Sequence, residues 1–183
     1  TSSLKLRCNP AATYDVNNLR LDGSNELNTR LVALDGRDLN VNDYQIDNER
    51  LVIFDVPPAF ELTTVVEIKP HNNTSLEGLY KSGEMYCTQC EAEGFRNITW
   101  YLDRPDVLSK YTTTIVADKA KFPILLSNGN DLERGEHGHR HWVTWQDPFM
   151  KPAYLFALVA GDLQHLEDEF VTMSGRKVKL KIF

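Results

Sequence analysis

Short runs of apolar and β-branched residues, separated by turn residues, recur along most of this chain. Runs of this length between Gly, Pro, Asn and Asp are typical of β-strands. Their number favours an all-β sandwich or saddle. The runs that predict strands are residues 31–34, 51–54, 62–68, 111–117, 124–126, 141–146, 154–160 and 178–183.

Two of these runs and two turns carry further expectations. Residues 154–160 form a continuous apolar run, which predicts a strand buried on both faces. Residues 178–183 are expected to pair with a strand at Val171 through a turn at Ser174 and Gly175. Asp35-Gly36 and the segment from Ser127 to Asn130 are strong turn signals.

The middle of the chain departs from this pattern. From Asn72 to Tyr101 the apolar residues lose their period of two, and three glycines punctuate the stretch. We expect a long irregular loop here, followed by one short helix over Arg104–Lys110, because Pro105 suits a first helical turn. Long irregular segments within a compact domain often carry function.

Length and charge limit the classes of function. A chain of 183 residues suits a single β-rich domain over residues 1–183. The net charge of −6 argues against nucleic acid as a partner, because binding phosphate needs a basic face. The longest apolar run, Tyr154–Ala160, is far shorter than the ~20 residues of a membrane-spanning helix, so no membrane partner is expected.

The cysteines and the ends of the chain indicate its setting. Cys8, Cys87 and Cys90 are an odd number, which does not suit a disulfide framework and favours a reducing, cytoplasmic location. The chain starts without Met and stops within an alternating pattern, which indicates a piece of a longer protein.

Several segments in one order resemble a known family. They are Cys87–Arg96, Tyr101–Leu108, Leu125–Asn130 and Gln146–Asp162. Together they are similar to the bacterial aminopeptidase N family of zinc peptidases (gluzincins), densely from about Pro70 to Asp162 and more loosely before. The resemblance implies an N-terminal β domain that packs against a thermolysin-like catalytic domain and belongs to an enzyme that removes single amino acids from peptide N-termini.

The resemblance also implies two substrate-binding residues. The Glu that matches Glu91 helps bind the free α-ammonium of the substrate, and the residue that matches Gln89 lines the pocket for the first side chain. A fixed carboxylate recognises a chain end because it pairs with a terminal ammonium and not with an internal amide. On an extended segment, residues two apart share a face, so we expect Gln89 and Glu91 to point into one cleft with Cys90 facing away. Glu93 is expected to be structural, paired with Arg96.

The sequence lacks the family's zinc motif. Catalysis in this family needs His-Glu-x-x-His on a helix and a further Glu, in which the two His bind zinc and the first Glu acts as general base. No such motif occurs in this chain, and we expect it after Phe183. We therefore predict no catalytic residue and no metal ligand here, zinc bound only elsewhere in the parent protein, and an isolated chain that is inactive. The expected partners are peptide N-termini and the chain's own downstream catalytic domain.

A non-catalytic β-sandwich that serves as a binding or interaction module is the alternative, because folds related to metallopeptidases can keep the architecture and lose the metal. A third hypothesis is a carbohydrate-binding domain with a stacking platform of exposed aromatic rings. Filling of a β core or an interdomain face is the favoured reading of these rings. They are Trp100, Tyr101, Trp142 and Trp145.

Two clusters raise the question of metal binding. Cys87 and Cys90 form a Cys-x-x-Cys pair, but a structural zinc site needs four ligands. We therefore interpret the two thiols as packing groups. His137, His139 and His141 are two residues apart and would share a face on one strand, where they could hold a metal adventitiously. Their flanking residues favour an exposed hairpin tip instead.

Overall fold

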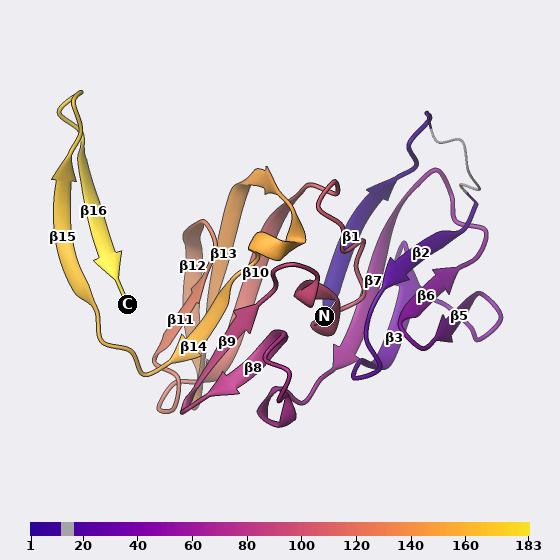
Figure 1. Cartoon of the computed structure of the whole chain (residues 1–183), viewed down its shortest axis with the longest axis horizontal. Coiled ribbons are helices and arrows are strands. Elements are labelled where there is room, and N and C mark those ends of the chain that lie inside the picture. Colours follow the sequence, from indigo (N-terminus) through magenta and orange to yellow (C-terminus); the bar gives the residue numbers. More distant parts are fainter. Residues whose placement is uncertain (12–16) are drawn as a thin grey trace.

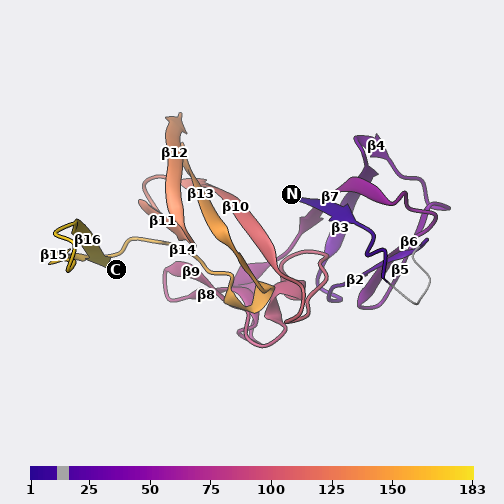
Figure 2. The ribbon, with the colours of Figure 1, turned by 90° about the horizontal axis from the view of Figure 1, so that it is seen from above.

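The computed structural model describes residues 1–11 and 17–183, and almost all of its regular structure is antiparallel β-sheet, as predicted (Figure 1). Two lobes of paired sheets lie side by side, and a final hairpin projects from the second lobe (Figures 1 and 2). We call the sheets formed by β1–β7 the first lobe and those formed by β8–β14 the second lobe.

The first lobe consists of two facing sheets with the strand orders β1-β7-β3-β4 and β2-β6-β5. Its strands are β1 (Ser2–Arg7), β2 (Leu19–Asp22), β3 (Asn28–Leu34), β4 (Arg37–Asp38), β5 (Tyr44–Asp47), β6 (Arg50–Ile53) and β7 (Ala59–Glu67). Asp35 and Gly36 connect β3 to β4 with φ of 50° and 77°, which is the backbone that a two-residue hairpin turn requires.

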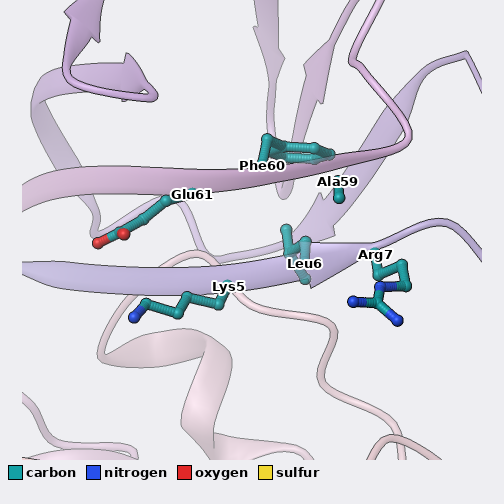
Figure 3. A pocket seen from close by; sticks show the side chains of 6 residues that line it. All are labelled: Lys5, Leu6, Arg7, Ala59, Phe60 and Glu61. Atoms are coloured by element: carbon teal, nitrogen blue, oxygen red, sulfur yellow. The ribbon is translucent and has the colours of Figure 1, made fainter.

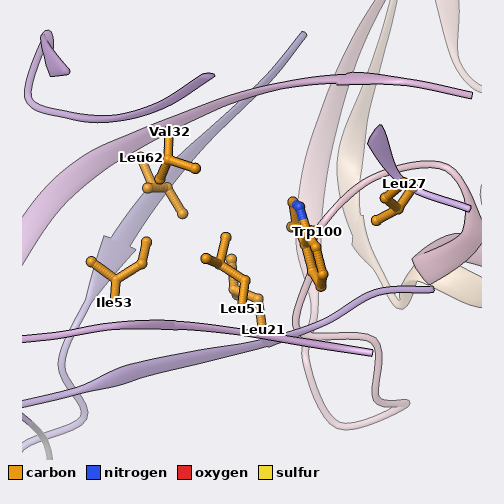
Figure 4. Packing of buried hydrophobic residues seen from close by; sticks show 7 residues of the cluster. All are labelled: Leu21, Leu27, Val32, Leu51, Ile53, Leu62 and Trp100. Atoms are coloured by element: carbon orange, nitrogen blue, oxygen red, sulfur yellow. The ribbon is translucent and has the colours of Figure 1, made fainter. Parts of the chain in front are cut away.

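Alternation along the strands builds the core of the first lobe. In β6, Leu51 and Ile53 are buried and Val52 between them is only partly covered, because successive side chains point to opposite faces. The buried side chains of the two sheets meet in one cluster (Figure 4), namely Leu21, Leu27, Val32, Leu51, Ile53, Leu62 and Trp100. Trp100 is the one member that comes from beyond β7.

The second lobe pairs a sheet of order β11-β14-β9-β8 with a sheet of order β10-β13-β12. Its strands are β8 (Gly78–Ser82), β9 (Met85–Gln89), β10 (Ser109–Asp118), β11 (Ile124–Ser127), β12 (Asn130–His137), β13 (Arg140–Lys151) and β14 (Leu158–Gly161). The predicted turn from Ser127 to Asn130 joins β11 to β12, and Gly129 has φ of 89° there. The core is a cluster of Ile115, Leu125, Val143 and Ala160.

Three short 3-10 helices complete the regular structure of the described residues. They are η1 (Pro70–Asn72), η2 (Gly94–Asn97) and η3 (Ala153–Leu155). A further buried cluster forms between η2, η3 and the segment before β10, and consists of Cys90, Phe95, Tyr101 and Ala153. Asp22 and Tyr101 exchange backbone hydrogen bonds of 2.8 and 3.0 Å, which tie β2 of the first lobe to this segment.

The terminal hairpin of β15 (Leu166–Val171) and β16 (Lys177–Ile182) has two unlike faces. Its pairing places Leu166 opposite Ile182 and Phe170 opposite Val178, so that apolar side chains gather on one face. Lys and Glu occupy the other face, with ion pairs from Lys181 to Glu167 at 2.7 Å and from Lys177 to Glu169 at 2.9 Å. The predicted pairing of these strands through Ser174 and Gly175 is confirmed.

Two expectations about the middle of the chain are wrong. Residues 72–101 are not one irregular loop, because β8 and β9 form a hairpin within them. The side chains of Met85–Thr88 are all partly covered, so burial does not alternate along β9. Residues 104–110 form no helix: Val107 N–H donates to the Arg104 carbonyl at 3.2 Å in a single turn, and β10 begins at Ser109.

The apolar run from Tyr154 to Ala160 is also not one strand. It begins within η3, and only its end belongs to β14. Pro152 precedes η3, and the Phe156 N–H donates to the Ala153 carbonyl at 3.0 Å, so the chain turns before it can extend. In the described residues, no helix is long and apolar enough to cross a bilayer.

Candidate functional site

Gln89 and Glu91 lie at the end of a strand that is held on both sides. Gln89 is the last residue of β9, whose Cys87 is paired with Tyr80 of β8 and with Val159 of β14. Glu91 follows two residues later, as the first residue of a turn. Pairing on both edges holds β9 at Cys87, and the pairing of Gln89 with Gly78 of β8 holds the strand up to the start of the turn.

The side chains at this site alternate as predicted. Cys90 is only 2% exposed and points into the core, while Gln89 and Glu91 are exposed. The Gln89 amide Nε2 donates to the Glu91 carbonyl at 3.3 Å, which places the two residues at one exposed corner. The Glu91 carboxylate takes part in no hydrogen bond or ion pair within the part of the chain that the structure describes. That the two side chains share one cleft stays a prediction.

A glycine is required where the turn closes. The Gly94 N–H donates to the Cys90 carbonyl at 2.8 Å and brings the chain back under β9. A Cβ at Gly94 would lie 2.5 Å from the Gln89 carbonyl oxygen, closer than such atoms approach. Residues 91–94 therefore form a tight turn between the end of β9 and η2, and we call these four residues the Glu91 turn.

An arginine and a buried aspartate hold the far side of the Glu91 turn. Arg96 donates to Asp103 Oδ2 from its backbone N–H at 3.0 Å and from Nε at 3.2 Å, and Nη2 donates to the Asp103 carbonyl at 3.0 Å. The Asp103 side chain is 2% exposed, and burial raises the pKa of its carboxyl although the Arg96 hydrogen bonds oppose that rise. The predicted pairing of Glu93 with Arg96 is confirmed at 3.3 Å.

Asp103 was missed by sequence reasoning. Its only signal was its place in Tyr101–Leu108, one of the segments that carry the family resemblance. A lone Asp between Leu and Arg gives no indication of burial, because Asp is mostly exposed in proteins.

Aromatic packing surrounds the buried side of the site. Phe95 of η2 packs edge-on against Tyr101 and Phe156, with ring centroids 4.9 and 5.0 Å apart. Burial in this cluster, together with the nearby Asp103 carboxyl, raises the pKa of the Cys90 thiol to about 12. Cys90 is therefore a neutral packing group beneath Gln89 and Glu91.

The histidines do not share a face of one strand, which speaks against the alternative of an adventitious metal site. His137 ends β12, His139 lies in the connecting turn and His141 belongs to β13, which confirms the hairpin tip. His141 Nε2 lies 2.7 Å from the Phe122 carbonyl oxygen. Among the described residues no three His, Cys, Asp or Glu side chains are placed to hold a metal ion.

The hypothesis of a sugar-stacking platform is wrong for Trp100. This side chain is 1% exposed and belongs to the core of the first lobe. Trp145 is partly covered, and its Nε1 donates to the Leu125 carbonyl at 3.1 Å. Core filling, the favoured reading of these rings, is confirmed for Trp100 and Tyr101.

An open pocket lies on the first lobe, between the edge strand β1 and its neighbour β7 (Figure 3). It is lined by Lys5, Leu6, Arg7, Ala59, Phe60 and Glu61. Neither Gln89 nor Glu91 contributes to it, so the pocket does not support the predicted site.

Comparisons with known proteins agree with this architecture. The sequence pattern of the peptidase M1 N-terminal domain matches residues 16–155. Aminopeptidase N of Caulobacter vibrioides is 60% identical over 153 residues, which are 83% of this chain and 18% of that protein. Aminopeptidase N of Escherichia coli is 55% identical over 163 residues, which are 83% of this chain and 19% of that protein. The chain thus spans less than a fifth of the length of these relatives.

A solved structure extends the likeness to the whole fold. Aminopeptidase A of Legionella pneumophila, solved in complex with aspartic acid, is 35% identical, with a TM-score of 0.92. The match covers 98% of this chain and 21% of that protein, so the arrangement of both lobes and the terminal hairpin recurs there.

Proposed function

The chain belongs to the peptidase M1 family and corresponds to its N-terminal domain, and we propose that it is part of a zinc aminopeptidase that removes single amino acids from peptide N-termini. The identity of 55–60% to proteins named aminopeptidase N supports this activity over that of a non-catalytic module. In this proposal the protein works in a reducing, cytoplasmic setting, which the free state of Cys8, Cys87 and Cys90 supports.

The described residues do not fit a zinc ion, because they offer no group of three ligand side chains. The metal would therefore be held by the remainder of the larger protein. Zinc there would supply an activated water and polarise the scissile carbonyl. This chain would contribute the recognition of the peptide end.

Glu91 is the residue proposed to recognise that end. Its carboxylate is exposed on a turn whose two sides are fixed, by β9 and by the Arg96–Asp103 contacts, and this observation carries the proposal. A carboxylate at a fixed place pairs with the α-ammonium, which sets the distance from the chain end to the scissile bond. The Gln89 amide lies beside it and would line the pocket for the first side chain without adding a charge.

The terminal hairpin supports a role within a larger protein. Leu166, Phe170 and Ile182 lie on its apolar face and are all exposed. An isolated two-stranded hairpin is marginally stable in water, so a further layer of protein is needed on this face. We assign that layer to the remainder of the aminopeptidase, which makes up most of the length of its relatives.

The test uses the full-length protein that contains this chain. Release of the first amino acid is measured on one peptide with a free and with an acetylated N-terminus, before and after zinc is removed with a chelator and restored. The proposal predicts zinc-dependent release from the free peptide alone. Zinc-independent turnover, equal cleavage of the acetylated peptide or no peptidase activity would contradict it, and the last result would favour the interaction module.

A further inference from the structure

We propose that Arg96 and Asp103 are positioning residues that hold the Glu91 turn at the distance which amine recognition requires. This inference rests on the proposed function of Glu91. Neither Arg96 nor Asp103 needs to touch the substrate, because both act on the position of the turn, which Arg96 contacts at the Glu93 carboxylate.

Arg96 connects the turn to a second segment with several donors at once. Its Nη2 reaches Glu93 Oε2 at 3.3 Å inside the Glu91 turn and the Asp103 carbonyl at 3.0 Å outside it. Its Nε and its backbone N–H both donate to Asp103 Oδ2. A planar guanidinium can serve two groups in fixed directions, which a lysine ammonium cannot do.

Asp103 in turn is anchored to the first lobe. Its backbone N–H donates to Asp22 Oδ2 at 3.3 Å, and Asp22 belongs to β2. Two residues before Asp103, Tyr101 exchanges both of its backbone hydrogen bonds with Asp22. The Arg96–Asp103 pair therefore links the Glu91 turn to the first lobe, whereas β9, which leads into the turn, belongs to the second lobe.

The turn needs this second support. The Gly94 N–H to the Cys90 carbonyl is the backbone hydrogen bond that closes it. The side chains of Glu91 and Glu93 are exposed and contribute no burial that would fix the turn, and the nearest buried side chain after it is that of Phe95. Misplacing a binding group by about 1 Å can lower a rate by as much as ~10²-fold, so we expect a turn that lacks the Arg96–Asp103 contacts to bind the amine less well.

The experiment measures KM and kcat of the full-length protein on an alanine anilide for Arg96→Gln, Glu91→Ala and the double variant. We expect Arg96→Gln to raise KM about tenfold with kcat changed by less than about twofold. Arg104→Gln is the matched control, because Arg104 pairs at 3.2 Å with the exposed Asp106 on the same segment. Its KM should equal that of the wild type.

The double variant separates positioning from general stability. If Arg96 acts through Glu91, Arg96→Gln should have no further effect on KM once Glu91 is Ala, because the cycle is then non-additive. If Arg96→Gln instead raises KM by the same factor in the wild type and in Glu91→Ala, and also lowers the melting temperature, Arg96 has a merely structural role and the inference is overturned.

The outcomes also separate this inference from the proposed function. An unchanged KM in Glu91→Ala would overturn both. A raised KM in Glu91→Ala together with an unchanged KM in Arg96→Gln would overturn the positioning role alone. Should Arg96→Gln fail to fold, Glu93→Gln breaks the exposed half of the same contact. That variant should raise KM by about two- to threefold, and an unchanged value would count against positioning.

Discussion

The indole Nε1 of Trp100 donates a hydrogen bond of 2.9 Å to the Thr29 hydroxyl, which joins the segment after η2 to strand β3 of the first lobe. The ring completes the cluster between the two sheets of that lobe (Figure 4). Gly23 leaves room for it, because a Cβ there would lie 2.1 Å from the ring. Part of the core of the first lobe is therefore supplied by a residue that follows β9 in the chain.

Trp100→Ala should destabilise the protein strongly. Truncating a fully buried Trp typically costs ~3–5 kcal/mol, through lost burial and the cavity that is left. Urea unfolding measures the change in the free energy of unfolding. Thr29→Val is the control, because it removes only the hydrogen bond and should cost about 1 kcal/mol. Equal losses in the two variants would show that the ring is not a core element.

Cys90 should be the least reactive cysteine of the native protein. Burial and the nearby Asp103 carboxyl raise the pKa of its thiol to about 12, so the reactive thiolate is scarce near neutral pH. Cys8 and Cys87 are partly exposed and serve as internal controls. Alkylation followed by mass spectrometry should label Cys90 last in the native protein and equally after unfolding. Early labelling of Cys90 in the native protein would contradict its placement.

The Asp147–Lys151 ion pair should make stability depend on pH. Lys151 Nζ lies 2.9 Å from Asp147 Oδ2 and 4.1 Å from the centroid of the Tyr111 ring. The hydrogen bond from Lys151, followed by that from the Phe149 N–H, lowers the pKa of the Asp147 carboxyl. A lowered folded-state pKa gives stability that is present above the unfolded value of about 3.9 and is lost as the pH falls through the folded one.

Asp147→Asn should therefore lower the melting temperature near neutral pH, with a difference from the wild type that shrinks below about pH 4. Asp106→Asn is the matched control, because the Arg104–Asp106 pair is exposed and surface pairs contribute little. A difference for Asp147→Asn that stays constant with pH would contradict the role of its charge.

Gly94→Ala should weaken substrate capture as well as stability. The added methyl would meet the Gln89 carbonyl oxygen at 2.5 Å, so the backbone on both sides of Glu91 would have to move. We expect KM for an alanine anilide to rise about tenfold in the full-length protein. Gly135→Ala is a control for a crowded glycine elsewhere, because its neighbour is the Trp142 ring. A normal KM in Gly94→Ala would show that the turn tolerates displacement.

The sequence predicted the elements whose signal is local. β7 follows from a run of β-branched residues, and the β15–β16 pairing follows from alternation and turn residues. The exposed Gln89 and Glu91 flank an inward Cys90 as the extended spacing requires. The β8–β9 hairpin was missed because the side chains of β9 are partly covered on both faces, so the strand has no single buried face and no period of two. Asp103 was missed because its burial depends on Arg96 and Asp22, contacts that no local pattern encodes.

The most direct test of the central claim compares kcat/KM on an alanine anilide between the wild-type full-length protein and Glu91→Ala. Glu84→Ala is the control, because Glu84 is a nearly fully exposed carboxylate that pairs with Lys81 on the same hairpin. We predict a fall of about tenfold or more for Glu91→Ala, mostly through a higher KM, and no change for Glu84→Ala. An active parent protein with the same kcat/KM in Glu91→Ala would contradict the assignment of Glu91 to the α-ammonium.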